Sequence, residues 1–319
     1  MINWRNWPVY YFWRFYKWQN KGDMSPIVAS FKLTQRCNLR CTHCPWLVSR
    51  DTELTIEEWK RKADYVWAQG CTVVVIEGGE PTLRKDLNEI IDYCRFIGLY
   101  VILISNGTRP LAQYNPNVIW ISMEGTKTTH DSIRGEGMFD KSFQTIKELY
   151  KKKHIITLTT LSPKNIGDIE PMCETLMPYL DGMWFSYVYP YKNIQDTILT
   201  SKEKQESAML IMKLKKEKYR DKIFNSYTFL KEVGRGWTCY PWLMIIITSN
   251  GDVKNGCMID HLERYNCKNC DLACNGELSK LYEAHADTRK AWAGNVGVPI
   301  TLNPFEWFRV TTQQKDKKI

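Results

Sequence analysis

The stretch C-N-L-R-C-T-H-C at residues 37–44 carries three cysteines in a C-x3-C-x2-C pattern. It follows an apolar run at residues 28–34, which has the composition of a short β-strand. Three thiolates on one short loop can bind three corners of a cubane [4Fe–4S] cluster and leave the fourth iron without a protein ligand. A zinc site would need a fourth ligand, for which only His43 is close in the sequence. The spacing therefore predicts a metal centre, and favours an iron–sulfur cluster over zinc.

The composition is compatible with this prediction. The chain has 319 residues, of which 44% are hydrophobic, so it can form one large domain or a main domain with a smaller appendage. Of its eleven cysteines, three lie in the quoted loop and five lie between residues 239 and 274. Such clusters are typical of metal binding in a reducing compartment. The isolated Cys71, Cys94 and Cys173 are expected to be buried as small hydrophobic residues.

The formal net charge of +9 permits an anionic partner, such as RNA, a phospholipid surface or a phosphorylated substrate, without choosing among them. The sequence contains no run of 18 or more apolar residues and no segment with the pattern of a signal peptide. We therefore expect a cytoplasmic protein without a transmembrane helix.

From residue 28 onward, short apolar runs alternate with amphipathic helical stretches. Strands are expected at 28–34, 73–77, 100–105, 118–123, 155–161 and 183–188, and helices at 55–69, 86–97, 141–152 and 168–177. This alternation predicts an α/β fold in which helices cover a parallel sheet. With six strands, the sheet is expected to form a partial (β/α)6 barrel.

The pattern changes after the sixth strand. The Lys-rich helix at 201–222 has the composition of a solvated connector, and the turn at 249–252 predicts a β-hairpin. We place a domain boundary near residue 225. The expected organisation is an aromatic and basic segment at 1–22, a partial barrel at 23–225 and a Cys-rich domain with a tail at 226–319.

Short polar motifs follow successive strands of the predicted sheet. Gly78-Gly79-Glu80-Pro81 ends the second strand and Ser105-Asn106-Gly107-Thr108 ends the third. Ser122 and Glu124 follow the fourth strand, and Arg134 lies in the next segment. Each motif alone is an ordinary turn. Their ordered placement at the carboxyl ends of parallel strands, where active sites of such folds lie, predicts a shared site.

This series, together with the C-x3-C-x2-C loop, resembles the radical S-adenosylmethionine (SAM) superfamily, in the subgroup with a SPASM- or twitch-like C-terminal domain. The resemblance spans residues 28–190. It implies that Cys37, Cys41 and Cys44 bind a [4Fe–4S] cluster whose open iron binds SAM. It also implies a reductant, such as ferredoxin or flavodoxin, and an enzyme that cleaves SAM to methionine and a 5′-deoxyadenosyl radical for C–H activation.

The resemblance also assigns SAM contacts. Gly78, Gly79, Glu80 and Pro81 would bind the amino group of SAM. The SAM ribose and carboxylate would contact Ser105, Asn106 and Gly107. Ser122 and Glu124 belong to the next motif, in which Glu124 replaces the usual aspartate, and Arg134 would pair with the SAM carboxylate.

A second cysteine group surrounds the predicted hairpin and consists of Cys239, Cys257, Cys267, Cys270 and Cys274. It resembles the auxiliary-cluster region of SPASM and twitch domains, and five cysteines imply one auxiliary [4Fe–4S] cluster. We favour Cys239, Cys257, Cys267 and Cys270 as ligands, while Cys274 either replaces one of them or stays free. A zinc ribbon is the alternative, because two cysteines flanking a hairpin plus C-x2-C also suit Zn²⁺.

The substrate is the least determined feature of the sequence. Residues 1–22 interleave Trp, Tyr and Phe with Arg and Lys, which fits a helix in a membrane interface, on the inner face of the membrane. This segment favours a membrane lipid as substrate, although aromatic residues equally suit a plug against the barrel or a dimer contact. A peptide-modifying maturase is the alternative. Nucleic acid is not favoured, because no recognised RNA module is present. Tyr187 and Tyr189, at the end of the sixth strand, either face substrate or pack inside the protein.

Overall fold

The computed structural model describes residues 14, 16–44, 52–189, 197–257 and 267–296. Its strands are β1 (Val28–Lys32), β2 (Val73–Glu77), β3 (Tyr100–Ser105), β4 (Val118–Ser122), β5 (Ile155–Leu161), β6 (Gly182–Tyr187), β7 (Met244–Ile247) and β8 (Val253–Asn255). Its α-helices are α2 (Ile56–Ala68), α3 (Leu87–Phe96), α4 (Lys127–Arg134), α5 (Met138–Leu149), α6 (Ile169–Leu176), α7 (Ser201–Glu217), α8 (Tyr227–Glu232), α9 (Ala273–Tyr282) and α10 (Ala286–Val296). The six strands predicted for the barrel are confirmed to within a residue or two at each end.

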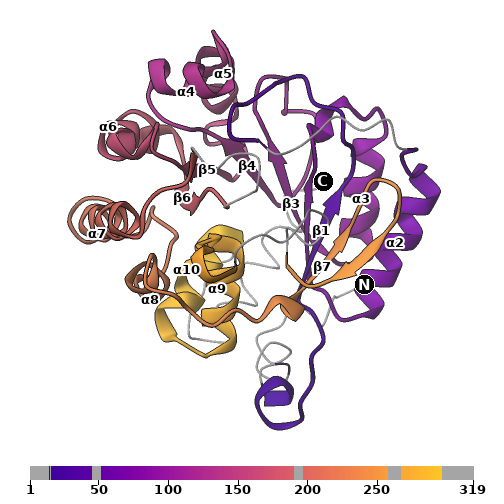
Figure 1. Cartoon of the computed structure of the whole chain (residues 1–319). Coiled ribbons are helices and arrows are strands. Elements are labelled where there is room, and N and C mark those ends of the chain that lie inside the picture. The colour runs from indigo at the N-terminus through magenta and orange to yellow at the C-terminus, as the bar shows by residue number, and fades with distance from the viewer. Residues whose placement is uncertain (1–13, 15, 45–51, 190–196, 258–266, 297–319) are drawn as a thin grey trace.

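The strands form one curved sheet in the order β6-β5-β4-β3-β2-β1-β7-β8. Strands β1 to β6 are parallel to their neighbours, β7 is parallel to β1, and β8 runs antiparallel to β7. Figure 1 shows the helices that follow these strands on the outside of the curve. The predicted α/β partial barrel is therefore confirmed. The hairpin shares this sheet, and the domain boundary near residue 225 stays a prediction.

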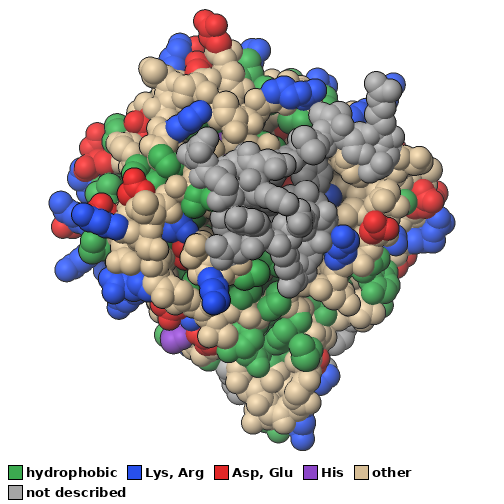
Figure 2. Space-filling view, viewed as in Figure 1, with side chains coloured by type: hydrophobic (Ala, Val, Ile, Leu, Met, Phe, Trp, Pro, Cys, Tyr) green, Lys and Arg blue, Asp and Glu red, His purple; other side chains and the backbone are tan. Residues whose placement is uncertain are grey.

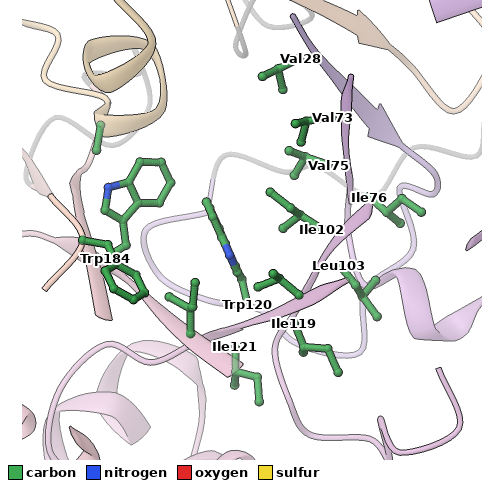
Figure 3. Packing of buried hydrophobic residues seen from close by; sticks show 14 of the residues in the cluster. Val28, Val73, Val75, Ile76, Ile102, Leu103, Ile119, Trp120, Ile121 and Trp184 are labelled. Carbon is green, nitrogen blue, oxygen red and sulfur yellow. The ribbon is translucent and has the colours of Figure 1, made fainter. Parts of the chain in front are cut away.

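Alternate side chains of each strand point to opposite faces of the sheet. In Figure 3, Val75, Ile102 and Trp120 lie on the inner face, whereas Leu103 and Ile121 lie on the outer face. The inner apolar residues fill the part of the barrel lumen that is nearer the amino ends of the strands. There the rings of Trp120 and Trp184 pack edge to face, with centroids 4.7 Å apart. This packing leaves polar inner positions only near the carboxyl ends of the strands.

Helix α2 illustrates why the outer helices form where the sequence predicts them. Thr55 caps its first turn reciprocally with Glu58, and the two acidic residues of that turn suit the helix dipole. Its buried face includes Trp59, whose ring lies 5.0 Å from that of Phe31 on β1. The cap and the apolar face together fix this helix against the outer side of the sheet.

The prediction that residues 201–222 form a solvated connector is wrong. Helix α7 packs against the protein with Ile211 and Leu214 buried, and it also buries Lys204 and Lys215. Both lysine ammonium groups bind acceptors on neighbouring segments, Lys204 at Asn269 and Asp271 and Lys215 at Asn225. Lysine composition suggested solvent exposure, but these side chains are buried because tertiary partners compensate their charge.

Helices α9 and α10 lie between β6 and β7 in Figure 1, on the open side of the partial barrel. Helix α9 contacts β6 as well as the turn Pro241–Leu243 that leads into β7. The C-terminal residues therefore close the lumen that the six barrel strands leave open. The isolated Cys71, Cys94 and Cys173 are buried, as predicted.

The described part of the N-terminal segment packs on the edge of the sheet where the strands begin. Trp18 is buried, and its ring lies 5.9 Å from those of Trp242 and Tyr282. Arg14 is also buried and donates to the carbonyls of Ser25 and Pro26. Residues 1–13 and 15, and the C-terminal tail from residue 297, lie outside the described residues. Within the described ranges, no helix is long and apolar enough to span a membrane.

Candidate functional site

A pocket of about 150 Å³ lies at the carboxyl ends of β1 to β4. Its walls include all three cysteines of the first loop and most of the polar residues that the sequence nominated. The lining residues are Cys37, Leu39, Cys41, His43, Cys44, Glu77, Gly78, Gly79, Ile104, Ser105, Asn106, Ser122 and Arg134. The sequence motifs therefore converge on one cavity, although Glu80, Pro81, Gly107 and Glu124 do not line it.

Gly78 and Gly79 let the cysteine loop pass directly over the end of β2. Gly78 has a φ of +139°, and a Cβ there would lie 2.5 Å from the carbonyl oxygen of Thr34. A Cβ on Gly79 would lie 2.2 Å from the carbonyl oxygen of Arg36. These distances exclude any side chain. The backbone N–H groups of Gly79 and Glu80 donate to Thr34 and Arg36, at 2.7 and 2.8 Å, and fasten the start of the loop.

Glu80 joins two of the motifs and is only 1% exposed. One carboxylate oxygen accepts hydrogen bonds from the Ser105 hydroxyl, at 2.9 Å, and from Thr82. The other accepts from the backbone N–H of Asn106, at 2.8 Å. Both oxygens are therefore occupied by the turn after β2 and the turn after β3. The expected contact between the Glu80 side chain and the SAM amino group stays a prediction, and the observed hydrogen bonds give this carboxylate a structural role.

Glu124 lies behind Arg134 rather than in the pocket wall. The Nη2 and Nε atoms of Arg134 donate to one Glu124 oxygen at 2.6 and 3.2 Å, and the backbone N–H of Thr160 donates to the other at 2.9 Å. Burial disfavours the ionised form of the Glu124 carboxyl group and by itself would raise its pKa. The charges of Arg134 and His43 together have the larger, opposite effect, so the pKa of Glu124 lies below its usual value. The charged pair thus orients the Arg134 guanidinium at the pocket.

Two of the three loop thiols, Cys37 and Cys41, are partly buried, whereas Cys44 is exposed. Burial raises the pKa of Cys37, and burial raises that of Cys41 to about 11. A bound cation would offset this cost, because metals bind the thiolate. In the described residues, no three Cys, His, Asp or Glu side chains converge closely enough to hold a single metal ion. Three thiolates on one short loop fit a cubane cluster, in which each cysteine binds a different iron.

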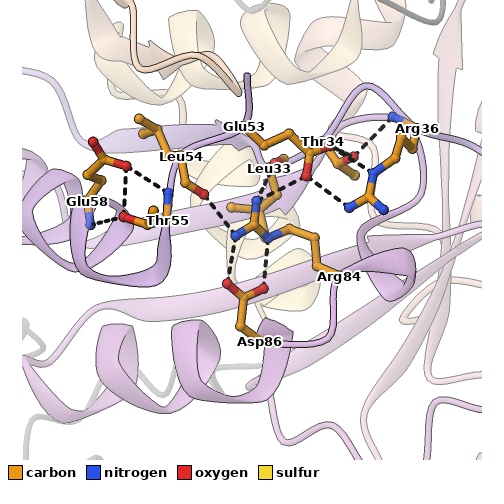
Figure 4. Close-up of polar contacts among 9 residues, drawn as sticks. All are labelled: Leu33, Thr34, Arg36, Glu53, Leu54, Thr55, Glu58, Arg84 and Asp86. Atoms are coloured by element: carbon orange, nitrogen blue, oxygen red, sulfur yellow. Dashed lines mark hydrogen bonds and ion pairs between the residues drawn. The ribbon is translucent and has the colours of Figure 1, made fainter. Parts of the chain in front are cut away.

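A network that the sequence reasoning missed holds both flanks of the cysteine loop (Figure 4). Arg84 is 7% exposed and donates to the carbonyls of Leu33 and Leu54, at 3.2 and 3.0 Å. It also pairs with Asp86 at 2.7 Å. Glu53 joins this group by accepting from Arg36 at 2.9 Å, one residue before Cys37. The only sequence signal for this role is the position of Arg84 three residues after Pro81, the last residue of the Gly-Gly-Glu-Pro motif.

The second cysteine group also gathers in space, with one change from the favoured set. Burial and the thiols of Cys257 and Cys239 raise the pKa of Cys270 to about 12. Burial and the thiols of Cys257 and Cys270 raise the pKa of Cys274 well above its usual value. Cys239 and Cys267 are both exposed, and of these two only Cys239 is among the neighbours that cause these shifts. The structure thus groups Cys274 with Cys239, Cys257 and Cys270.

A buried ion pair fixes the loop that carries Cys270. Lys204 Nζ on α7 lies 2.9 Å from a carboxylate oxygen of Asp271 and 2.7 Å from the carbonyl oxygen of Asn269. Both side chains of the pair are 4% exposed. The indole N–H of Trp237 donates to the carbonyl of Cys270, at 2.9 Å. Residues that flank the cysteine in sequence are thus anchored to a helix more than 50 residues earlier in the chain.

Another buried ion pair lies in the lumen between the two cysteine groups. Lys32 and Glu77 face each other on β1 and β2, with Nζ and Oε1 2.9 Å apart. The Ser30 hydroxyl donates to the same oxygen, at 2.6 Å. Glu77 lines the pocket and also contributes to the raised pKa of Cys274. The sequence reasoning missed this pair because Lys32 and Glu77 lie on strands whose pattern is otherwise apolar.

The proposed substrate-facing role of Tyr187 is wrong. Its side chain is on the outer face of β6, 1% exposed, and its hydroxyl lies 3.2 Å from that of Ser207 on α7. Burial raises its pKa, which keeps the phenol neutral. Tyr189 is 2% exposed and does not line the pocket. Both tyrosines therefore pack inside the protein, which was the other reading of their position.

Known proteins with similar sequences support the interpretation of this pocket as a radical SAM site. Residues 31–176 match the family model of the Radical SAM superfamily. The chain is 31% identical to the Fe-coproporphyrin III synthase of Methanosarcina barkeri, over 50% of this chain and 42% of that protein. It is 33% identical to the antilisterial bacteriocin subtilosin biosynthesis protein AlbA of Bacillus subtilis, over 51% of this chain and 39% of that protein. The chain thus covers less than half the length of these relatives.

The fold extends the similarity. The crystal structure of Streptococcus suis SuiB bound to precursor peptide SuiA superposes with a TM-score of 0.62, at 13% identity, over 76% of this chain and 62% of that chain. Residues 31–176 form a radical SAM domain. The resemblance to its subgroup with a SPASM- or twitch-like C-terminal domain is confirmed. The family's cofactors are a [4Fe–4S] cluster and SAM, and the thiols and Arg134 of the described pocket fit both.

Proposed function

We propose that this chain is a radical SAM enzyme that modifies a peptide. The observation that carries the enzymatic part is the single pocket shared by Cys37, Cys41, Cys44 and Arg134. A [4Fe–4S] cluster bound by these thiolates would deliver one electron to SAM and release a 5′-deoxyadenosyl radical. The electron would come from a reductant such as ferredoxin or flavodoxin.

The chain's own residues would orient SAM and shield the reaction from water. Arg134, held by Glu124 at 2.6 Å, provides a fixed cation for the SAM carboxylate. Gly78 and Gly79 bring backbone groups to the pocket wall, and Ser105 and Asn106 provide polar side chains there. Below them, Trp120 and Trp184 fill the lumen and exclude water and other hydrogen donors.

The second cysteine group is proposed to hold one auxiliary [4Fe–4S] cluster. We assign its ligands as Cys239, Cys257, Cys270 and Cys274, because these thiols raise one another's pKa and Asn275 contacts both Cys257 and Cys274. The buried thiols need a compensating cation, and relatives of this subgroup carry such clusters. The cluster would lie at the side of the lumen that α9 closes.

A peptide is favoured as substrate by the polarity of the lumen. Lys32, Glu77 and Ser30 form a polar group beside the pocket, where a long apolar tunnel for a lipid tail would need apolar walls. Peptide N–H and C=O groups match such partners. The similarity to AlbA, a bacteriocin biosynthesis protein, supports the same class.

The lipid hypothesis loses its main argument in this geometry. It required the aromatic N-terminal segment to deliver lipid to the mouth of the barrel. The described residues of that segment, including Arg14 and Trp18, instead pack where the strands begin, at the opposite edge from the pocket. Membrane association through residues 1–22 stays a prediction. A nucleic-acid partner is not supported by the face in Figure 2, where Lys and Arg side chains are interspersed with Asp and Glu.

Deuterium transfer can identify the substrate class. Cells of the source organism are grown in heavy water, and peptide, lipid and tetrapyrrole fractions are incubated separately with the reduced enzyme and unlabelled SAM. We expect deuterium in 5′-deoxyadenosine only with the peptide fraction. Transfer from the lipid or the tetrapyrrole fraction alone would replace the peptide proposal, and the Cys41→Ala variant serves as the control without SAM cleavage.

A further inference from the structure

The side chain of Asn275 contacts two sulfur atoms of the second cysteine group. Its Oδ1 atom lies 3.6 Å from Cys257 Sγ and 3.4 Å from Cys274 Sγ. Asn275 is only 2% exposed and lies in the first turn of α9, directly after Cys274. The contact joins two cysteines that are 17 residues apart in the sequence, as their numbers show. No sequence motif predicted it.

The chemistry of this contact changes when the thiols become ligands. A free thiol can donate its hydrogen to an amide oxygen, which is the arrangement in the described structure. A thiolate bound to iron has no hydrogen and can only accept. The two ends of an asparagine amide have nearly the same shape, so a rotation of the amide presents its NH₂ group to the same sulfurs.

We propose that Asn275 donates N–H···S hydrogen bonds to the auxiliary-cluster thiolates of Cys257 and Cys274 and thereby raises the reduction potential of that cluster. Hydrogen bonds to the sulfurs are one of the factors that set iron–sulfur potentials, because they stabilise the more negative, reduced state. Asn275 would act as a positioning and tuning residue, and would not touch SAM or substrate. The inference rests on the proposed auxiliary cluster.

The surroundings make this amide the relevant donor. Glu77 is the neighbouring acidic group that raises the pKa of Cys274, and a negative charge opposes reduction of a nearby cluster. The carboxylate of Glu77 is partly compensated by Lys32, at 2.9 Å. The Asn275 amide contacts the sulfur directly, in a site without water competition, where a hydrogen bond is stronger than in solvent.

The test uses the full chain with Cys37, Cys41 and Cys44 all replaced by Ala, so that only the auxiliary cluster remains. Its midpoint potential is measured by redox titration monitored with EPR. We expect Asn275→Leu to lower the ratio of reduced to oxidised cluster about tenfold at a fixed potential, which is about 59 mV for one electron. Asn275→Asp should lower it further, because it adds a negative charge. Asn255→Leu, an exposed asparagine two residues before Cys257, is the matched control and should not change the ratio.

The outcomes separate the two proposals. A parent protein without an iron–sulfur cluster contradicts the auxiliary-cluster proposal and this inference together. A full cluster whose potential is the same in Asn275→Leu as in the parent contradicts only the inference. If both variants fail to bind iron, the parent labelled with ¹⁵N-asparagine decides by pulsed EPR of the reduced cluster. Coupling to a labelled side-chain nitrogen that exceeds the coupling in an Asn275→Gln sample supports the inference, and no such coupling overturns it.

Discussion

The two cysteine groups of this protein face the same lumen but are built in different ways. Cys37, Cys41 and Cys44 lie on one loop of eight residues, which backbone hydrogen bonds and Arg84 fasten at the end of β1. The second group draws Cys239, Cys257, Cys270 and Cys274 from separate segments around α9, β8 and α7. The first site is therefore local in sequence, whereas the second exists only when the C-terminal residues close the barrel.

Because the two cysteine groups are assembled differently, they depend on different contacts. Spacing along the chain already brings the first three thiols together. The second group needs tertiary contacts such as the Lys204–Asp271 ion pair, and a change far from any cysteine can dismantle it. Mutations that separate the two sites are the most direct way to examine this contrast.

The largest expected effect comes from replacing Cys37, Cys41 and Cys44 together by Ala. Because all three thiols belong to the local site, we expect the loss of about four of about eight irons and of all SAM cleavage, with the second cluster retained. Iron, sulfide and 5′-deoxyadenosine are measured in anaerobically purified protein. Cys94→Ala, a buried cysteine away from both groups, is the control. Loss of all iron in the triple variant would mean that the sites are not independent.

The next effect distinguishes two cysteines of the second group. Cys274→Ala should lose the auxiliary cluster, because the half-buried Cys274 lies beside Cys257 and Cys270. Cys267→Ala should keep it, because Cys267 is exposed outside that group. Iron content and the EPR spectrum of the reduced protein report both results. The opposite pattern would restore the ligand set favoured by the sequence.

Lys204→Met tests the dependence of the second group on α7. Removing one partner of a buried ion pair leaves an uncompensated charge and costs about 3–5 kcal/mol in the free energy of unfolding. We expect this destabilisation in urea titrations, together with partial loss of auxiliary iron. Replacing Asp271 by Leu in the same chain should recover most of the stability. Lys202→Met is the control. Lys202 is exposed, and its ion pair with Glu206 is long, at 3.9 Å, so its loss should change the free energy of unfolding little. Equal effects of the two lysine variants would argue against the anchor.

The smallest expected effect is a pH dependence in α9, the helix that carries Cys274. Burial raises the pKa of Glu277 from 4.5 to about 7, and Ser226 is its hydrogen-bond partner. Between these values the folded state keeps a proton that the unfolded state has lost. The carboxyl group therefore favours folding most below pH 4.5, and its contribution declines as the pH rises to 7, by about 3 kcal/mol at most.

Glu277→Gln should remove this slope. The measurement is the difference in the free energy of unfolding between wild type and Glu277→Gln, followed from pH 5 to pH 7.5. The difference should shift in favour of the variant as the pH rises. A constant difference over this range would show that Glu277 is ionised in the folded protein throughout.

Sequence patterns predicted the barrel strands well, because their segments are short and rich in apolar and β-branched residues. The ranges 73–77, 100–105 and 155–161 agree with β2, β3 and β5 at both ends. Helix α4 was not predicted, since Lys127–Arg134 is short and mostly polar. The pairing of β7 with β1 was also not predictable, because it joins strands from distant parts of the chain.

The residues of the candidate site also fall into those that could be predicted from the sequence and those that could not. The cysteine loop and the Gly-Gly turn could be identified from spacing, since their geometry is local. The roles of Glu80, Arg84 and Glu124 could not, because each depends on a partner brought by another strand. The helix that carries Lys204 was assigned to solvent from its composition, and the position of Tyr187 allowed either a substrate-facing or a packing role. Burial against α7 and its neighbours decides both, and burial is a tertiary property.

The central claim is that two distinct clusters share this barrel and that only the local one binds SAM. EPR of the reduced, anaerobically purified protein, recorded with and without SAM, tests it most directly. We expect two [4Fe–4S]⁺ signals. One of them should change on addition of SAM and disappear in the variant in which Cys37, Cys41 and Cys44 are all replaced by Ala. A single signal, or two signals that both respond to SAM, would contradict it.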